Sequence, residues 1–327
     1  MELLHRRSIK AAAHESLVAA PYDPRKLIMI HTGITIAVSL LGTTLNFILA
    51  KQIENTGGLG GLGMRSMLST IQSVLQVLVA VLLPFWEAGY CYATMRIARG
   101  QEAAPDSLLQ GFRRFRPLLR VKLVQGVLYC LAGMACFFLG YYIFMLTPLS
   151  DPLYAIIETV NIDPTMLQTE LLLDDATMLA MADAYTPMLL IWLVLFLVAG
   201  TFLFYRFRFA TYLALDYPQM RAMEMLRFST YQLRGHTGDL VKLDVSLLWF
   251  FALELLTAML AYGDYLLPLF DVQLPLSADV AYFAFLLLSL VLLGALFIWA
   301  RNRVDVAYAK FYCLTELPLH KEDDQNP

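Results

Sequence analysis

The sequence predicts an all-α fold, a polytopic membrane bundle of six transmembrane helices with amphipathic helices on its cytoplasmic side. Composition is the first reason: 59% of the residues are hydrophobic and 16% charged, whereas soluble domains carry about 45–50% apolar and about 25% charged residues. In addition, the apolar residues gather in long runs, and the basic residues gather between those runs. The net charge of -3 gives no reason to expect nucleic acid as a partner.

Six apolar runs have the length of a membrane crossing. A hydrocarbon core about 30 Å thick needs about 20 apolar residues in a helix. Helices are favoured because the runs are continuous rather than alternating and because backbone in lipid must satisfy its own hydrogen bonds. The predicted spans are residues 27–50, 67–90, 121–148, 184–206, 244–265 and 280–300.

Lysine and arginine predict the orientation of these spans. The N-terminal segment, the second-to-third connection, the fourth-to-fifth connection and the C-terminal tail hold 22 of the 24 basic residues. Basic segments remain in the cytoplasm, so we predict a multi-pass protein of the cell membrane with both termini cytoplasmic. The connection 151–183 has seven acidic residues and no basic one, and we place it outside. The charged first 26 residues are not typical of a cleavable signal peptide.

Amphipathic segments at 3–20, 106–117 and 219–234 precede the odd-numbered spans and predict three repeats of amphipathic helix, span and span. The second segment has an apolar face flanked by Arg113, Arg114 and Arg116, and we expect Pro117 to end it. Gly235 follows the third, where a helix C-cap belongs. These helices either bind the anionic inner leaflet or pack beneath the bundle. Because every connection is too short to fold alone, we predict a single domain over 1–327.

Residues 216–268 carry a string of recognisable positions: Asp216, Pro218, Ser229, Gly235, the tetrapeptide Leu243-Asp244-Val245-Ser246, Trp249, and Pro268 in a Leu-Leu-Pro setting. This string resembles the bacterial integral membrane family catalogued as domain of unknown function 975. The stretch 111–115, Gly-Phe-Arg-Arg-Phe, also fits a pattern common in such proteins. The long acidic connection departs from that pattern. The resemblance implies a bacterial multi-span membrane protein and implies no reaction and no catalytic residue.

Acidic residues in or beside the spans are the candidate intramembrane functional residues. Glu254 lies near the centre of the fifth predicted span, where a charge costs about 2.5–3.5 kcal/mol on insertion scales. It is either an ion or proton site or a neutral acid hydrogen-bonded to another helix. Glu87 follows Pro84, which can kink the second span, and its simpler interpretation is a carboxylate paired with a nearby arginine. For Asp216 we expect a salt bridge with an arginine of the same connection, Arg206, Arg208 or Arg221.

Other polar residues have plain structural interpretations. His31 and Asn46 in the first span are typical of interhelical hydrogen bonds. Asp244 and Ser246 suit the N-terminus of the fifth span, where side-chain oxygens cap free amides. Trp249 is typical of the aromatic belt at the membrane interface.

No catalytic, metal or cofactor motif is recognisable. The four cysteines lack C-x-x-C spacing, and the sequence has neither an H-E-x-x-H nor a G-x-S-x-G motif. We therefore predict a non-enzymatic membrane component, an adaptor or an inner-leaflet-interacting protein, with Arg113, Arg114 and Arg116 binding anionic lipids or a membrane protein partner. A small-solute or ion transporter that uses a mid-membrane carboxylate, Glu254, is the alternative. An intramembrane enzyme acting on lipids would need polar residues converging at one depth.

Overall fold

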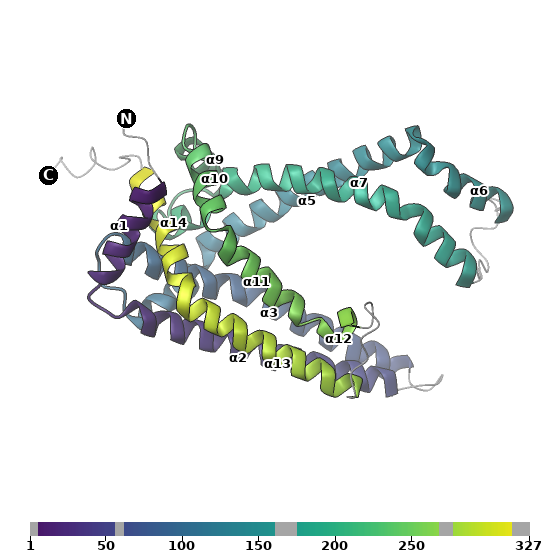
Figure 1. The fold of residues 1–327 in the computed structure, drawn as a ribbon, viewed down its shortest axis with the longest axis horizontal. Coiled ribbons are helices and arrows are strands. Elements are labelled where there is room, and N and C mark those ends of the chain that lie inside the picture. The colour runs from purple at the N-terminus through teal and green to yellow at the C-terminus, as the bar shows by residue number, and fades with distance from the viewer. Residues whose placement is uncertain (1–5, 56–61, 161–174, 268–276, 316–327) are drawn as a thin grey trace. The chain divides into compact units, whose positions relative to one another are not determined.

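The computed structural model describes residues 6–55, 62–160, 175–267 and 277–315 (Figure 1). Within these ranges every regular element is helical and there is no strand. The all-α prediction is therefore confirmed. Contacts group the chain into two compact units, residues 1–119 with 209–327 and residues 120–208, where the sequence predicted a single domain. Each unit is described by itself.

Five helices in the described ranges are long and apolar enough to cross a membrane. They cover 24–53, 66–98, 115–146, 179–216 and 279–315, and a bent pair of helices at 237–260 is a sixth candidate. These candidates overlap the six predicted spans, so the chain is a multi-pass membrane protein. Their side chains agree with lipid as the solvent: large apolar residues such as Val77, Val198 and Leu255 are each more than 60% exposed.

The first unit contains α2 (Pro24–Asn55), α3 (Leu62–Ala98), α11 (Leu248–Leu260) and α13 (Ala278–Leu296). As Figure 1 shows, α2 packs against α3 and α13, and α13 packs against α11. The last span continues beyond α13 through one π-helical turn, Phe297–Arg301, into α14 (Asn302–Thr315). Short helices α8 (Ala210–Asp216) and α12 (Gly263–Leu266) also belong to this unit.

The second unit consists of α5 (Phe115–Leu146), of which residues from 120 onward belong here, α6 (Asp151–Val160) and α7 (Asp175–Phe207). Its buried cluster is small: Phe144, Leu153, Ala184 and Met188. The first ten residues of the acidic connection form α6. Residues 161–174 of that connection lie outside the described residues, and its last nine residues form the start of α7. Its place on the outer side of the membrane stays a prediction.

The fifth predicted span is not one continuous helix. A bend of 58° separates α10 (Thr237–Ser246) from α11. Asp244 therefore lies in the last turn of α10, where it accepts a hydrogen bond from the Tyr308 hydroxyl. Ser246 donates its own hydroxyl to the Leu243 carbonyl, 2.6 Å away. Our prediction that these two side chains cap the span is wrong, because the residue before α11 is Leu247, which makes no side-chain cap.

The first and third amphipathic segments are observed with shifted boundaries. The first is α1 (Arg6–Val18), which packs against α14, and the third is α9 (Ala222–Gln232). Residues 3–5 of the first lie outside the described residues. The C-cap of α9 is Leu233 and not the predicted Gly235; Gly235 lies two residues farther on, with a φ of +89°, in the turn that follows the helix.

The second segment, predicted as one helix at 106–117, is broken into pieces. It consists of a 3₁₀ turn η2 (Pro105–Leu109), then α4 (Gln110–Arg113), and the first turn of α5. Arg114 interrupts the helix with φ -99° and ψ 31°. Our prediction that Pro117 ends a helix is wrong: it lies in the first turn of α5, where a missing N–H removes no hydrogen bond.

Two glycines hold this second segment directly against α3. A Cβ at Gly89 would lie 1.8 Å from the Leu108 carbonyl oxygen, and a Cβ at Gly111 would lie 1.8 Å from the Phe85 carbonyl oxygen. Neither position can accept a side chain unless the two backbones separate. The Gly-Phe-Arg-Arg-Phe stretch therefore has a packing reason for its glycine.

Candidate functional site

Arg301 is the centre of a charged cluster in the first unit. Its guanidinium lies 2.5 Å from Glu87 Oε2 on α3 and 3.1 Å from Asp305 Oδ2 on α14. The Arg301 side chain is 15% exposed and those of Glu87 and Asp305 are about one-third exposed. The predicted pairing of Glu87 with an arginine is confirmed, although the partner comes from 214 residues along the chain.

The π-helical turn at Phe297–Arg301 places this guanidinium. A π turn inserts one extra residue into a helix, and such turns are frequent at functional sites. The guanidinium carbon of Arg301 lies 4.4 Å from the centre of the Phe297 ring and 5.3 Å from that of Tyr90. Two aromatic rings and two carboxylates thus surround one cation at the junction of α13 and α14.

His31 on α2 is fully buried beside this cluster. Its ring lies parallel to that of Trp86, with centroids 5.4 Å apart, and stacks on Tyr90 at 4.5 Å. Nε2 is 3.7 Å from Glu87 Oε1, which is too far for a hydrogen bond. Among the described residues neither ring nitrogen has a hydrogen-bond partner, and Asn46 Oδ1 has none either. The interhelical hydrogen bonds predicted for these two side chains are therefore not observed for these atoms.

A series of hydrogen bonds joins α2, α3 and α14, the helices that surround this cluster. The Tyr90 hydroxyl donates to Asn302 Oδ1 at 2.6 Å, and Asn302 Nδ2 donates to the Pro24 carbonyl at 2.8 Å. The indole N–H of Trp86 donates to the His31 carbonyl at 3.3 Å. This network ties α3 to α2 and to the start of α14, and so fixes the helices that carry the charges.

Glu254 acts on this cluster from α11. It is half-buried, and Arg301 and Asp305 are charged groups that act electrostatically on it. Glu254 in turn acts on Glu87. The two carboxylates that the sequence singled out, Glu254 and Glu87, thus both interact electrostatically with the Arg301 guanidinium. With all three carboxylates ionised these side chains have more negative than positive charge, so the cluster is suited to a proton or a cation.

A second ion cluster lies where α3, α8 and α14 contribute side chains. Arg99 donates two hydrogen bonds to the Asp216 carboxylate, at 2.8 and 2.6 Å, and the Tyr312 hydroxyl donates a third at 2.8 Å. The predicted salt bridge of Asp216 is confirmed, but Arg99 was not among the partners that we expected. Arg206 and Arg208 lie over the rings of the phenylalanines four residues before them.

The three arginines of the second amphipathic segment differ in their surroundings. Arg113 and Arg116 are exposed, whereas Arg114 is half-buried with its guanidinium 5.0 Å from the centre of the Tyr92 ring. Around them Leu109, Phe112 and Phe115 are each about 40–50% exposed. We call these exposed residues the arginine–phenylalanine surface: Leu109, Phe112, Arg113, Phe115 and Arg116.

Sequence reasoning missed Arg301, Tyr90 and Asn302 as members of a site. In the sequence, Arg301 is one of the basic residues of the C-terminal tail. One signal could have found it, because Arg301 directly follows the uncharged apolar run 280–300. The π turn that positions its side chain has no marker in the sequence.

Among the described residues, no group of three or more His, Cys, Asp or Glu side chains could hold a metal ion. The four cysteines, Cys91, Cys130, Cys136 and Cys313, form no disulfide. In comparisons with known proteins, no family model matches the chain, and no curated protein and no solved structure matches it. The resemblance of residues 216–268 to a bacterial membrane family therefore stays a prediction.

Proposed function

We propose that this protein is a non-enzymatic component of the membrane that engages anionic lipids of the inner leaflet through its arginine–phenylalanine surface. One observation carries the proposal: Leu109, Phe112 and Phe115 are exposed beside the exposed Arg113 and Arg116. Apolar side chains with arginines around them suit the boundary between headgroups and acyl chains. Each arginine near an anionic surface contributes about 1 kcal/mol to the attraction.

The packing of this segment against α3 supports the proposal. The close approaches at Gly89 and Gly111 fix the segment on α3, and the Phe85 ring lies 4.7 Å from that of Phe115 and 6.3 Å from that of Phe112. Leu108, by contrast, is buried. One side of the segment thus packs under the bundle while the other stays open, which combines the two interpretations that the sequence left open.

The distribution of basic residues supports the orientation. The arginine–phenylalanine surface belongs to a connection with seven basic residues, and such connections face the cytoplasm. We therefore place both termini in the cytoplasm and the protein in the cell membrane, with the surface at the inner leaflet.

The test replaces Arg113, Arg114 and Arg116 by glutamine and compares the lipids that co-purify in mild detergent. We expect enrichment of anionic over zwitterionic lipid to fall about fivefold for each exposed arginine lost, following the contribution of about 1 kcal/mol per residue. The control, Arg227→Gln with Arg234→Gln, removes exposed arginines from α9 and the turn after it. Equal lipid profiles for the triple variant and the wild type would end the proposal.

A small-solute or ion transporter is the second candidate, favoured by Glu87 and Asp305, which both pair with Arg301, and by the electrostatic effect of Arg301 on Glu254. Acidic residues within spans often mark ion or proton pathways. Glu254→Gln in a proton or cation flux assay with liposomes tests this, and Glu224→Gln, at an exposed position on α9, is its control. Flux that Glu254→Gln leaves unchanged argues against the transporter.

A further inference from the structure

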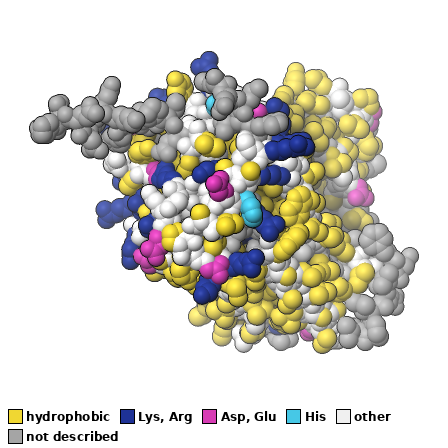
Figure 2. All heavy atoms as spheres, turned by 60° about the vertical axis from the view of Figure 1, so that its left-hand side comes forward, with side chains coloured by type: hydrophobic (Ala, Val, Ile, Leu, Met, Phe, Trp, Pro, Cys, Tyr) yellow, Lys and Arg dark blue, Asp and Glu magenta, His cyan; other side chains and the backbone are white. Residues whose placement is uncertain are grey.

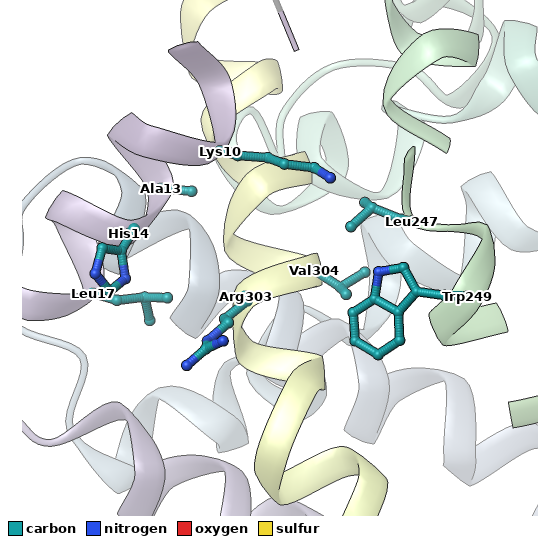
Figure 3. A pocket seen from close by; sticks show the side chains of 8 residues that line it. All are labelled: Lys10, Ala13, His14, Leu17, Leu247, Trp249, Arg303 and Val304. Carbon is teal, nitrogen blue, oxygen red and sulfur yellow. The ribbon is translucent and has the colours of Figure 1, made fainter. Parts of the chain in front are cut away.

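A cavity of about 380 Å³ opens between α1, the α10–α11 bend and α14 (Figure 3). Figure 3 shows the Lys10 side chain extending from α1 toward Leu247 at the bend, with Trp249 and Arg303 below it. A second cavity of about 730 Å³ shares His14, Leu17 and Arg303 with the first. We call the two cavities together the α1 groove.

Basic groups predominate among the charges of the α1 groove. Lys10, Arg25 and Arg303 line it together with His14, and Asp23 is the one carboxylate among the lining residues. Asp23 Oδ1 already accepts the backbone N–H of Arg25 at 2.9 Å. Neither Lys10 nor Arg303 has a carboxylate partner among the residues that the structure describes. An anion in the groove would therefore meet more positive than negative charge among the described lining residues.

Lys10 is held in position by a neutral carbonyl group and not by a carboxylate of the described residues. Its Nζ donates to the Ser246 carbonyl at 3.1 Å, at the end of α10 where the bend begins. Partial burial, and after it the positive charge of Arg6, lower the pKa of Lys10. Both effects oppose the charged form of the amine, so a nearby anion would stabilise it.

The walls of the groove are apolar and continue onto the spans. Trp299 is 62% exposed, Trp249 44% and Ile298 41%. The two indole rings meet with centroids 5.5 Å apart. Tryptophan is enriched where a span reaches the headgroup region, so the pair is placed to border both headgroups and acyl chains. Figure 2 shows lysine, arginine, aspartate and glutamate side chains gathered on the face in view.

We propose that the α1 groove binds one anionic phospholipid, with its headgroup among the basic side chains that line the groove, Lys10 and Arg303, and its acyl chains against Trp249, Trp299 and Ile298. Cationic groups beside exposed apolar side chains match the two ends of such a lipid. A soluble phosphate compound would leave the apolar wall uncovered. The inference rests on the proposed function in one respect, the orientation of this end toward an anionic leaflet; the arginine–phenylalanine surface shares no residue with the groove.

The first experiment counts bound lipid by native mass spectrometry of the purified full chain titrated with phosphatidylglycerol or phosphatidylcholine. We expect one phosphatidylglycerol to bind more tightly than any phosphatidylcholine. Lys10→Gln with Arg303→Gln should weaken that binding about tenfold or more, because hydrogen bonds to charged groups are the strong ones. Arg227→Gln with Arg234→Gln, a variant with the same loss of charge, should leave it unchanged.

The second experiment reports where the lipid lies. Phosphatidylglycerol with brominated acyl chains should quench the tryptophan fluorescence of the wild type in a saturable manner, and Trp249→Phe with Trp299→Phe should abolish the saturable part. Inorganic phosphate in large excess should not relieve the quenching. If it does, the groove is a site for soluble phosphate and the lipid proposal is wrong.

Different outcomes would overturn the groove and the proposed function. Unchanged binding in a folded Lys10→Gln, Arg303→Gln variant overturns the groove, even if the Arg113, Arg114 and Arg116 variant loses anionic lipid. If only the groove variant loses anionic lipid, the result supports a lipid site in the groove and contradicts lipid binding by the arginine–phenylalanine surface. Should the double variant fail to fold, Arg303→Gln alone carries the test, since Arg303 is exposed.

Discussion

In the first unit α3 and α14 are joined by charged and hydrogen-bonded side chains, whereas in the second unit α5 and α7 meet through glycines, one tryptophan and a small apolar cluster that includes Phe144 and Met188. Arg301 and Arg99 each bind a carboxylate at 2.5–2.8 Å in the first unit. In the second, a Cβ at Gly140 would lie 3.3 Å from the Trp192 backbone, and the Trp192 indole donates to the Gly133 carbonyl at 3.1 Å.

This difference follows from the solvent around each region. Lipid is as apolar as leucine, so helices within the membrane associate through close packing and a few hydrogen bonds. The ion pairs of Arg301 and Arg99 lie where α14 extends the last span beside α1 and α3, among basic segments. Basic segments beside spans are typical of the membrane–water boundary, where water would lower the cost of keeping these charges ionised. The first unit therefore depends on specific partners and the second on shape.

The largest expected effect is the loss of Arg301. Arg301→Met should lower the free energy of unfolding by about 2–3 kcal/mol, at or below the low end of the range for buried pairs, because the carboxylates left without a partner are each about one-third exposed. Here two carboxylates, Glu87 and Asp305, lose their partner. Unfolding by sodium dodecyl sulfate in mixed micelles measures the change.

Arg303→Met is the matched control, since Arg303 is exposed and lies two residues away. Adding Glu87→Gln and Asp305→Asn to Arg301→Met should restore most of the lost stability, because the uncompensated charges are then removed. If the Arg301 and Arg303 variants unfold at the same detergent fraction, the first unit does not depend on its ion pairs.

The next effect concerns the two glycines at the α3 contact. Gly89→Ala and Gly111→Ala should each destabilise the protein by about 1–3 kcal/mol, as in other overpacked sites, because the new Cβ meets backbone at 1.8 Å. Gly140→Ala in the second unit should cost less, since its closest contact is 3.3 Å. The same unfolding measurement compares all three.

Gly126→Ala and Gly200→Ala serve as controls because nothing lies within 4 Å of the new Cβ. Alanine is the better helix former by about 1 kcal/mol, so these two variants should be neutral or slightly stabilised. A Gly111→Ala variant as stable as the wild type would show that the arginine–phenylalanine surface is not fixed on α3 by close packing.

The spans could be predicted because length and hydropathy are set by the thickness of the bilayer. The bend at Leu247 could not, since residues 244–249 contain neither proline nor glycine and fall within a predicted span. The π turn at Phe297–Arg301 has no sequence signal either. Both departures lie beside tertiary contacts that a sequence does not reveal, such as the hydrogen bond of Lys10 to the Ser246 carbonyl.

The sequence indicated which acidic side chains need a partner better than it indicated which arginine that partner is. The cost of a charge in lipid singled out Glu254 and Glu87, and the structure places both in the field of Arg301. For Asp216 the expected arginines were close in sequence, yet Arg99, 117 residues away, is the partner. Sequence distance says little about which helices lie side by side in a bundle of several spans.

The smallest expected effect tests the second unit. Trp192→Phe keeps most of the ring but removes the N–H that binds the Gly133 carbonyl, and interhelical hydrogen bonds in membranes contribute about 0.6 kcal/mol on average. Trp299→Phe, at an exposed tryptophan for which the structure describes no hydrogen bond, is the control in lipid-free detergent. Both variants lose the same atoms, so the difference in their unfolding free energies isolates the hydrogen bond. Equal losses would mean that α5 and α7 are held by shape alone, which would widen the contrast with the first unit.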